Sequence, residues 1–226
     1  AGAELCERLD ARANGRATIS PLVANMPTYT QLGMASLLPH KTLTIAPNGT
    51  LLADGEPTNG LTNRIKILQK FEPEAVAFRF DEISSWTRAT ADEQLKGKRL
   101  VYVYHDVIDA AGDSVKSERE TYAAVERAMD DLVKLVDLLS RWQAKRIFIT
   151  ADHGFLYQNS KVENAEKVAS VEGEKFDSNR RFIIGENLVI GAGAIAVPET
   201  FTTLQGAEKA IAKGINRFVG GGGLQF

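Results

Sequence analysis

Two continuous apolar runs separated by a long amphipathic segment limit the fold more than any other feature of the sequence. The runs are 99–104 and 146–150, and neither alternates polar with apolar residues. Such runs are typical of parallel strands covered on both faces. Between them, Ser117 and Glu120 form a capping-box pattern, and apolar residues then recur at steps of three and four as far as Leu139. The pattern predicts a βαβ unit with a right-handed crossover, and therefore an α/β fold.

Shorter elements surround this unit. We expect further helices over 3–14, 30–38, 63–71 and 204–214, and further strands over 17–20, 42–45, 75–78, 181–184 and 189–197. The length of 226 residues suits one large α/β domain or two small ones. The first residues read as the middle of a helix and the last as the start of a strand. We therefore expect the chain to be a fragment, truncated at both ends, of a longer protein.

Composition excludes several classes of protein. The net charge of −2 shows no global basic bias, so contact with nucleic acid would need a local patch. Arg180, Arg181 and Lys41 could contact phosphate, and the alternative is a solvated surface role. The lone Cys6 excludes an internal disulfide and suits a reducing, cytoplasmic compartment. No run of 18 apolar residues and no signal-peptide pattern is present, so we expect no membrane association.

Acidic and imidazole side chains follow both strong apolar runs. The first run is followed by His105, Asp106, Asp109 and Asp113, and the second by Asp152 and His153. In open α/β sheets, ligands bind beyond the carboxyl ends of the strands. Carboxylate oxygens and imidazole nitrogens suit zinc, manganese or magnesium, so we expect a metal site there. The alternatives are that Asp-His-Gly is only a turn with a helix cap, and that His105 makes a core hydrogen bond instead of supporting a metal ligand.

Two threonines stand where the helix over 30–38 should begin. The hydroxyls of Thr28 and Thr30 would lie near free backbone N–H groups, which together with the helix dipole favour an anion such as phosphate. A threonine hydroxyl is a poor nucleophile, but it loses its proton more easily when a divalent metal binds it. The alternative interpretation is that both threonines only cap the helix.

Three motifs together resemble the PglZ domain, a family of the alkaline phosphatase superfamily found in bacterial phage-resistance (BREX) systems. They span residues 26–40, 102–113 and 150–157, and the stretch 47–98 carries little of the likeness. The resemblance implies a three-layer α/β/α sandwich with a mainly parallel central sheet. It also implies that 1–226 is a single PglZ-type, alkaline-phosphatase-like domain.

The resemblance further implies two divalent metals around a Ser or Thr nucleophile. By motif position, Thr30 is the nucleophile, and Asp152 and His153 are ligands of the metal that activates it. Asp109 matches a ligand of the other metal. Asp113 stands where the superfamily pattern has a histidine, and this departure favours magnesium or manganese over zinc.

Two further ligands of the family pattern, an aspartate before the first helix and a histidine near the other end, are missing from the 226 residues. We therefore expect this chain to bind metal weakly and to be poorly active. For the parent protein the resemblance implies a metal-dependent phosphohydrolase or phosphodiesterase of phage defence, with a phosphate ester as substrate. Nucleic acid is one candidate substrate, and other defence-system proteins are the expected partners. The alternatives are a scaffold or binding module with a degenerate site, and a phosphate-shifting enzyme of the same superfamily.

Overall fold

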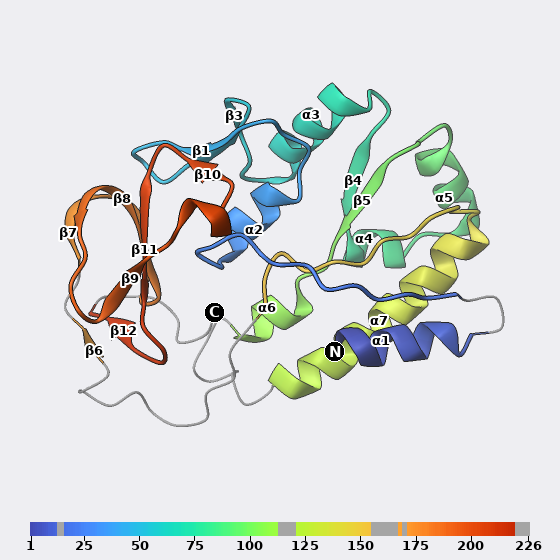
Figure 1. Ribbon diagram of the computed structural model, residues 1–226. Coiled ribbons are helices and arrows are strands. Elements are labelled where there is room, and N and C mark those ends of the chain that lie inside the picture. The colour runs from blue at the N-terminus through green and yellow to red at the C-terminus, as the bar shows by residue number, and fades with distance from the viewer. Residues whose placement is uncertain (13–15, 113–120, 155–166, 169–170, 220–226) are drawn as a thin grey trace. The chain divides into compact units, whose positions relative to one another are not determined.

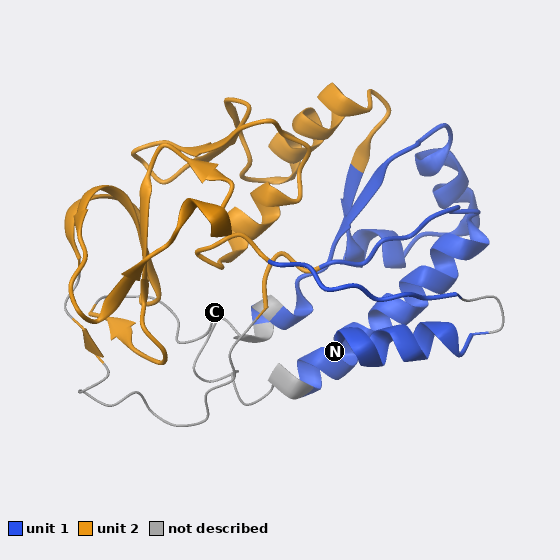
Figure 2. Ribbon diagram, viewed as in Figure 1, with its two compact units in different colours: residues 1–23, 77–150 blue, residues 24–76, 151–226 orange. Residues whose placement is uncertain are grey.

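The chain forms two compact units, and each is built from two separate stretches of sequence (Figure 2). The computed structural model describes residues 1–226 except 13–15, 113–120, 155–166, 169–170 and 220–226, and the side chains of residues 109, 111, 112, 121 and 122. Unit 1 contains Ala1–Val23 and Ala77–Thr150, and unit 2 contains Ala24–Val76 and Ala151–Phe226. The chain therefore passes from one unit to the other three times.

Unit 1 is mainly helical (Figure 1). Its helices are α1 (Gly2–Asp10), α4 (Phe80–Ser84), α5 (Arg88–Leu95), α6 (Val107–Gly112) and α7 (Thr121–Arg141). Its strands β4 (Val76–Arg79), which begins at the unit boundary, and β5 (Val101–Tyr104) form a two-stranded sheet. The helix predicted between the two apolar runs is confirmed as α7, and it buries Ala124, Ala128, Met129 and Val133. The first apolar run is confirmed as β5.

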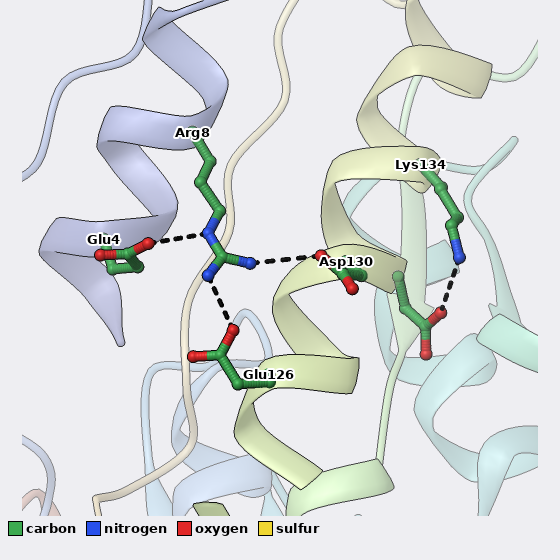
Figure 3. Close-up of polar contacts among 6 residues, drawn as sticks. Glu4, Arg8, Glu126, Asp130 and Lys134 are labelled. Atoms are coloured by element: carbon green, nitrogen blue, oxygen red, sulfur yellow. Dashed lines mark hydrogen bonds and ion pairs between the residues drawn. The ribbon is translucent and has the colours of Figure 1, made fainter. Parts of the chain in front are cut away.

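One arginine joins α1 to α7 (Figure 3). The Arg8 Nε lies 2.9 Å from the Glu4 carboxylate on its own helix, and the two Nη atoms reach the α7 carboxylates of Glu126 at 2.7 Å and Asp130 at 3.2 Å. A guanidinium presents its donors in a rigid planar fork, which lets one side chain meet three acceptors. These ion pairs are partly exposed, so their main effect is to fix the register of α1 on α7.

The second apolar run is not a strand, and the predicted βαβ unit is therefore wrong for the described residues. Residues 146–150 pair with no described strand, and Phe148 is 88% exposed. The strand predicted over 17–20 is also wrong for the same reason, and Ile19 in it is exposed. A strand forms only where a neighbouring strand accepts and donates its backbone hydrogen bonds.

Unit 2 holds most of the described strands. Its helices are α2 (Thr30–Ser36), α3 (Leu61–Phe71) and the short 3₁₀ turn η3 (Glu199–Phe201). Its strands are β1 (Leu43–Ile45), β2 (Leu51–Ala53), β3 (Glu56–Pro57), β6 (Lys167–Val168), β7 (Glu172–Ser178), β8 (Phe182–Val189), β9 (Ala194–Ala196), β10 (Leu204–Gln205), β11 (Glu208–Ala212) and β12 (Arg217–Phe218). None of the described helices of either unit combines the length and apolar composition needed to cross a membrane.

The strands of unit 2 form separate sheets. Their orders are β10-β1-β2-β3, β7-β8-β11-β9 and β12-β6. The β1–β10 and β6–β12 pairs are parallel, and the other described pairs in these sheets are antiparallel. Strands β8, β9, β11 and β12 contribute to one buried core, which consists of Val171, Ile183, Ala194, Ala210, Ala212 and Phe218. The pairings establish a mixed α/β fold, whose described strands are mostly antiparallel.

The segment 204–214 corrects another prediction. The sequence predicts a short helix there, and its several Ala, Glu and Lys residues do have high intrinsic helix propensity. Instead it forms β10 and β11, and β11 pairs with β8 on one side and β9 on the other. A central strand gains packing and hydrogen bonds from two neighbours, which outweighs an intrinsic helix preference of about 0.5 kcal/mol per residue.

Candidate functional site

Helix α2 begins at Thr30, but neither threonine caps it. The N-cap residue is Tyr29, whose backbone is extended and whose side chain makes no capping hydrogen bond. Thr28 is exposed and lies outside the helix. The interpretation of Thr28 and Thr30 as caps is therefore wrong, and the Thr30 hydroxyl makes a different contact.

That contact is with His153. The Thr30 Oγ lies 3.1 Å from the His153 Nε2, although the two residues are 123 positions apart in the sequence. The His153 side chain is almost fully buried, with only 4% of it exposed, and Thr30 is half-buried. The Oδ2 of Asp152 lies 3.5 Å from the same Nε2. The structure thus brings Thr30, Asp152 and His153 of unit 2 to one point.

The other nitrogen of the ring sets the tautomer of His153. Its Nδ1 lies 2.7 Å from the carbonyl oxygen of Gly154, which can only accept a hydrogen bond. The proton of the neutral imidazole is therefore assigned to Nδ1, and Nε2 keeps its lone pair. That lone pair accepts the Thr30 hydroxyl proton in a hydrogen bond, and it is also the form of histidine that binds metals.

A network of polar contacts holds the segment that leads into α2. The Asn25 side-chain amide donates to Ser36 Oγ on α2 at 2.5 Å and to Thr203 Oγ1 at 2.8 Å, while its Oδ1 accepts from the backbone N–H of Thr203 at 2.8 Å. The N–H of Met26 donates to the Phe201 carbonyl at 3.0 Å. Sequence reasoning missed Asn25, because its partners lie far along the chain.

Gly33 is a second residue that sequence reasoning missed. A Cβ placed on it would lie 2.7 Å from the carbonyl carbon and 2.8 Å from the Cβ of Asp152, which is closer than real Cβ atoms approach. Only glycine allows α2 to approach the backbone of Asp152 this closely. A glycine inside a predicted helix is unfavourable by about 1 kcal/mol relative to alanine, and that anomaly was the available signal.

Tyr29 packs beneath the start of α2. Its ring centroid is 4.2 Å from that of Phe182 on β8, and its side chain is buried. The hydroxyl lies close to Asp177, but the geometry of a direct hydrogen bond is not met. Burial raises the pKa of the Tyr29 hydroxyl far above its usual value, and burial also raises the pKa of Asp177. Burial therefore favours the neutral forms of the Tyr29 hydroxyl and of the Asp177 carboxyl.

The two separations among these donors match those of ligands that share one divalent cation. Ligand atoms about 2.1 Å from a common ion are separated by about 3.0 Å in octahedral and about 3.4 Å in tetrahedral geometry. In unit 2 the Thr30 Oγ lies 3.1 Å from the His153 Nε2, and the Asp152 Oδ2 lies 3.5 Å from the same nitrogen. Within the described residues, no group of three or more His, Cys, Asp or Glu side chains has an arrangement that could by itself hold a metal ion. A cation held here would thus take its remaining ligands from water, from substrate or from residues that the structure does not describe.

The predicted ligands of the other metal lie in a different part of the chain. Asp109 is in α6 of unit 1, where only its backbone is described, and Asp113 lies outside the described residues. His105 directly follows β5 in unit 1. Its ring meets Phe80 edge-on at 4.8 Å, and its Nε2 lies 3.7 Å from an Asp131 carboxylate oxygen. His105 therefore packs between β5 and the helices of unit 1.

Arg181, considered above as a phosphate contact, has a structural role. It is half-buried, and its Nη1 donates to the carbonyl oxygen of Asn216, to which Arg217 also donates. Burial, reinforced by the charge of Arg217, lowers the pKa of Arg181. A solvated surface role is thus wrong for this arginine, and its contact with phosphate stays a prediction.

Comparison with known families decides where the chain belongs. The model of the BREX system PglZ alkaline phosphatase-like domain matches residues 1–225. The chain belongs to the PglZ family.

The chain is also similar in sequence to two curated proteins. The alkaline phosphatase-like protein PglZ of Bacillus cereus (strain H3081.97) is 32% identical over 218 residues, which cover 95% of the chain. The alkaline phosphatase-like protein BrxZ of Escherichia coli O9:H4 (strain HS) is 34% identical over 232 residues, which cover 99% of the chain.

The PglZ match covers much less of the relatives than of this chain. The matched region is 26% of the length of each, so the chain spans about a quarter of the curated relatives. No solved structure matches the chain. Membership of the PglZ family confirms the resemblance carried by the three sequence motifs, and it makes this chain an alkaline phosphatase-like domain of BREX proteins.

Proposed function

We propose that this PglZ domain carries the nucleophile of a metal-dependent phosphohydrolase or phosphodiesterase, and that Thr30 is that nucleophile. The observation that supports the proposal is the 3.1 Å contact between the Thr30 Oγ and the Nε2 of His153. A nucleophilic hydroxyl needs a neighbouring group that favours its deprotonated form. Thr28, the other candidate, is exposed and has no such place in the site.

The residues of the chain have separate roles in this proposal. The Thr30 oxygen loses its proton, attacks phosphorus and forms a phosphothreonine ester, while the ester oxygen on the opposite side takes up a proton and leaves as an alcohol. Water then hydrolyses the phosphothreonine, which restores the hydroxyl and releases phosphate from a monoester substrate or a phosphate monoester from a diester substrate. His153 and Gly33 keep the geometry fixed, because His153 is buried and Gly33 holds the Asp152 backbone against α2.

A divalent cation would be held by Asp152, by the Thr30 oxygen and by the Nε2 lone pair of His153, which would then bind the cation in place of the Thr30 hydroxyl proton. When bound, the cation would supply positive charge that favours loss of the Thr30 proton and neutralises charge on the phosphate. For the longer protein we propose a second cation held with Asp109 and Asp113, whose oxygen ligands favour magnesium or manganese over zinc.

The proposal extends to the organisation of the longer protein. Residues 1–226 would form part of one PglZ-type domain whose complete core is a three-layer α/β/α sandwich with a mainly parallel sheet. A phosphate ester would be the substrate, nucleic acid being one candidate, and other BREX proteins would be the partners.

Turnover of bis(p-nitrophenyl) phosphate by the full-length protein tests the proposal. Thr30→Ala should abolish turnover, whereas Thr30→Ser, which keeps the hydroxyl, should retain part of it. The matched control is Thr62→Ala, because Thr62 is an exposed threonine in the first turn of α3. Unchanged turnover in Thr30→Ala would remove Thr30 from the mechanism.

A scaffold function is the second candidate, and the aspartate at position 113 favours it, because it replaces a histidine of the superfamily pattern. A scaffold would co-purify with other BREX proteins, and that association would survive both removal of divalent metal and Thr30→Ala. Calorimetric titration of the full-length protein with manganese separates the two functions, since a scaffold would show no binding that depends on Asp152.

A further inference from the structure

The side chain of Lys209, on the central strand β11, is completely buried. None of it is exposed, whereas lysines are almost never fully buried unless they are paired. Its Nζ lies 2.7 Å from a carboxylate oxygen of Glu199 in η3, which is the one polar partner of the ammonium among the described residues. The Glu199 side chain is 74% exposed, so it remains largely hydrated. A buried ion pair adds little net stability, and its better-attested effect is to select one arrangement of the elements that it joins.

Lys209 lies on the same face of its sheet as Phe182. In the register of β11 and β8, Lys209 is opposite Ile184, and Ile211 is opposite Phe182. Because every second residue of a strand points to the same face, these four side chains share one face of the sheet. On that face Phe182 packs against the ring of Tyr29, the N-cap residue of α2. The buried lysine and the start of α2 are therefore on the same side of the sheet.

Element η3 and the residue Thr203 hold the segment that leads to Thr30. The carbonyl oxygen of Phe201, the last residue of η3, accepts from the N–H of Met26 at 3.0 Å. Thr203 makes two hydrogen bonds with the side chain of Asn25, through its N–H and its Oγ1, and both are 2.8 Å long. Asn25 and Met26 lie directly before the turn into α2. The position of η3 on the sheet is thus passed on to the threonine.

We propose that Lys209 is a positioning residue for Thr30, because its ion pair with Glu199 fixes η3 on β11 and η3 fixes the segment that carries the threonine. The inference rests on the proposed function, in which Thr30 is the nucleophile. Lys209 touches neither the substrate nor the reacting atoms. Loss of the ion pair would let η3 shift relative to β11, and Thr30 would shift relative to His153. A displacement of about 1 Å at a reacting group can reduce turnover by about a hundredfold.

Lys209→Met in the full-length protein tests the proposal, because methionine fills the buried space without a charge. Replacing the buried member of an ion pair by an apolar residue is often neutral for stability, so the melting temperature should stay within about 4 °C of the wild-type value. We expect kcat for bis(p-nitrophenyl) phosphate to fall at least about tenfold, while KM changes less than about twofold. The matched control is Lys213→Met, which replaces an exposed lysine directly after β11 and should keep wild-type turnover.

Hydrogen exchange of the same variant gives a readout that does not require enzymatic activity. The backbone amides of 25–36 should exchange at least about tenfold faster in Lys209→Met than in the wild-type protein. The amides of α3, another helix of unit 2, should exchange at an unchanged rate. A lysine that only stabilised the fold would not change exchange in 25–36 alone.

Glu199→Gln separates the ion pair from the packing of Lys209. It removes the carboxylate charge at an exposed position and leaves the lysine side chain in place. We expect it to reproduce the loss of kcat. The double variant with Lys209→Met should lose no more turnover than Lys209→Met alone, because both changes break the same contact. Wild-type turnover in Glu199→Gln would contradict a role for the ion pair.

Three results with Lys209→Met would overturn the proposal. The first is wild-type exchange of 25–36, and the second is equally accelerated exchange of α3, which would indicate a general loss of stability. The third is wild-type kcat in a protein whose turnover Thr30→Ala abolishes. If Thr30→Ala instead keeps full turnover, the proposed function fails, and the exchange of 25–36 alone decides whether Lys209 fixes that segment.

Discussion

The contact between Gly33 and Asp152 predicts that one added methyl group will disturb the site more than the fold. In Gly33→Ala the new Cβ would come closest to the carbonyl oxygen of Asp152 and would lie 2.7 Å from its carbonyl carbon, where ordinary contacts begin near 3.4 Å. Helix α2 or the Asp152 backbone must therefore move by about 1 Å. Such overpacking typically costs about 1–3 kcal/mol, and alanine returns about 1 kcal/mol through its better helix propensity. The free energy of unfolding should therefore fall by about 0–2 kcal/mol.

The same shift acts directly on the contact between Thr30 and His153, because His153 follows Asp152 in the chain. A displacement of this size at a reacting group can reduce turnover by about tenfold to a hundredfold. We therefore expect a large loss of phosphodiester turnover in the full-length Gly33→Ala protein, with a fall in melting temperature of at most about 8 °C. The control is Gly191→Ala, where a Cβ meets nothing within 4 Å. Wild-type turnover at a wild-type melting temperature would refute the idea that Gly33 sets the site geometry.

Other perturbations test separate parts of the molecule. Arg8→Ala should lower the melting temperature at low ionic strength, and the difference should shrink in about 1 M NaCl as the ion pairs are screened; Arg127→Ala, exposed on α7, should have little effect. Burial raises the pKa of Asp177, so its contribution to stability is present below its unfolded pKa of about 3.9 and is lost as pH rises through the folded value. Asp177→Asn should therefore stabilise the protein at about pH 7 but not at about pH 3 in urea unfolding. Dialysis of the full-length protein against EDTA should abolish phosphodiester turnover, and magnesium or manganese should restore it; full turnover without metal would contradict a metal-dependent site.

Local patterns predicted the elements that form without distant partners. The spacing of apolar residues located α7, and the turn residues before Thr30 located the start of α2. Patterns failed where a distant neighbour decides the structure. Residues 204–214 have helix-forming composition but pair with β8 and β9, and 146–150 has a strand-like sequence but no described strand beside it.

In the candidate site, too, some residues could be predicted from the sequence and others depend on distant contacts. Motif position selected Thr30, Asp152 and His153, and the structure places their side chains together. Gly33 and Asn25 were missed, because each matters through a contact that no local pattern encodes: Gly33 touches a backbone more than a hundred residues away, and Asn25 bonds to Thr203. The roles of the selected residues as nucleophile and metal ligands remain predictions.

The interleaving of the two units has a consequence for how the protein is made. Strand β1 pairs with β10 through Leu43 and Leu204, which leave the ribosome 161 residues apart. At about 5–20 residues per second, β1 waits about 8–32 s for its partner. Throughout part of that interval Thr30 has already emerged while His153 has not. A nascent chain arrested before residue 151 thus carries the threonine without the histidine, and the site forms only late in translation.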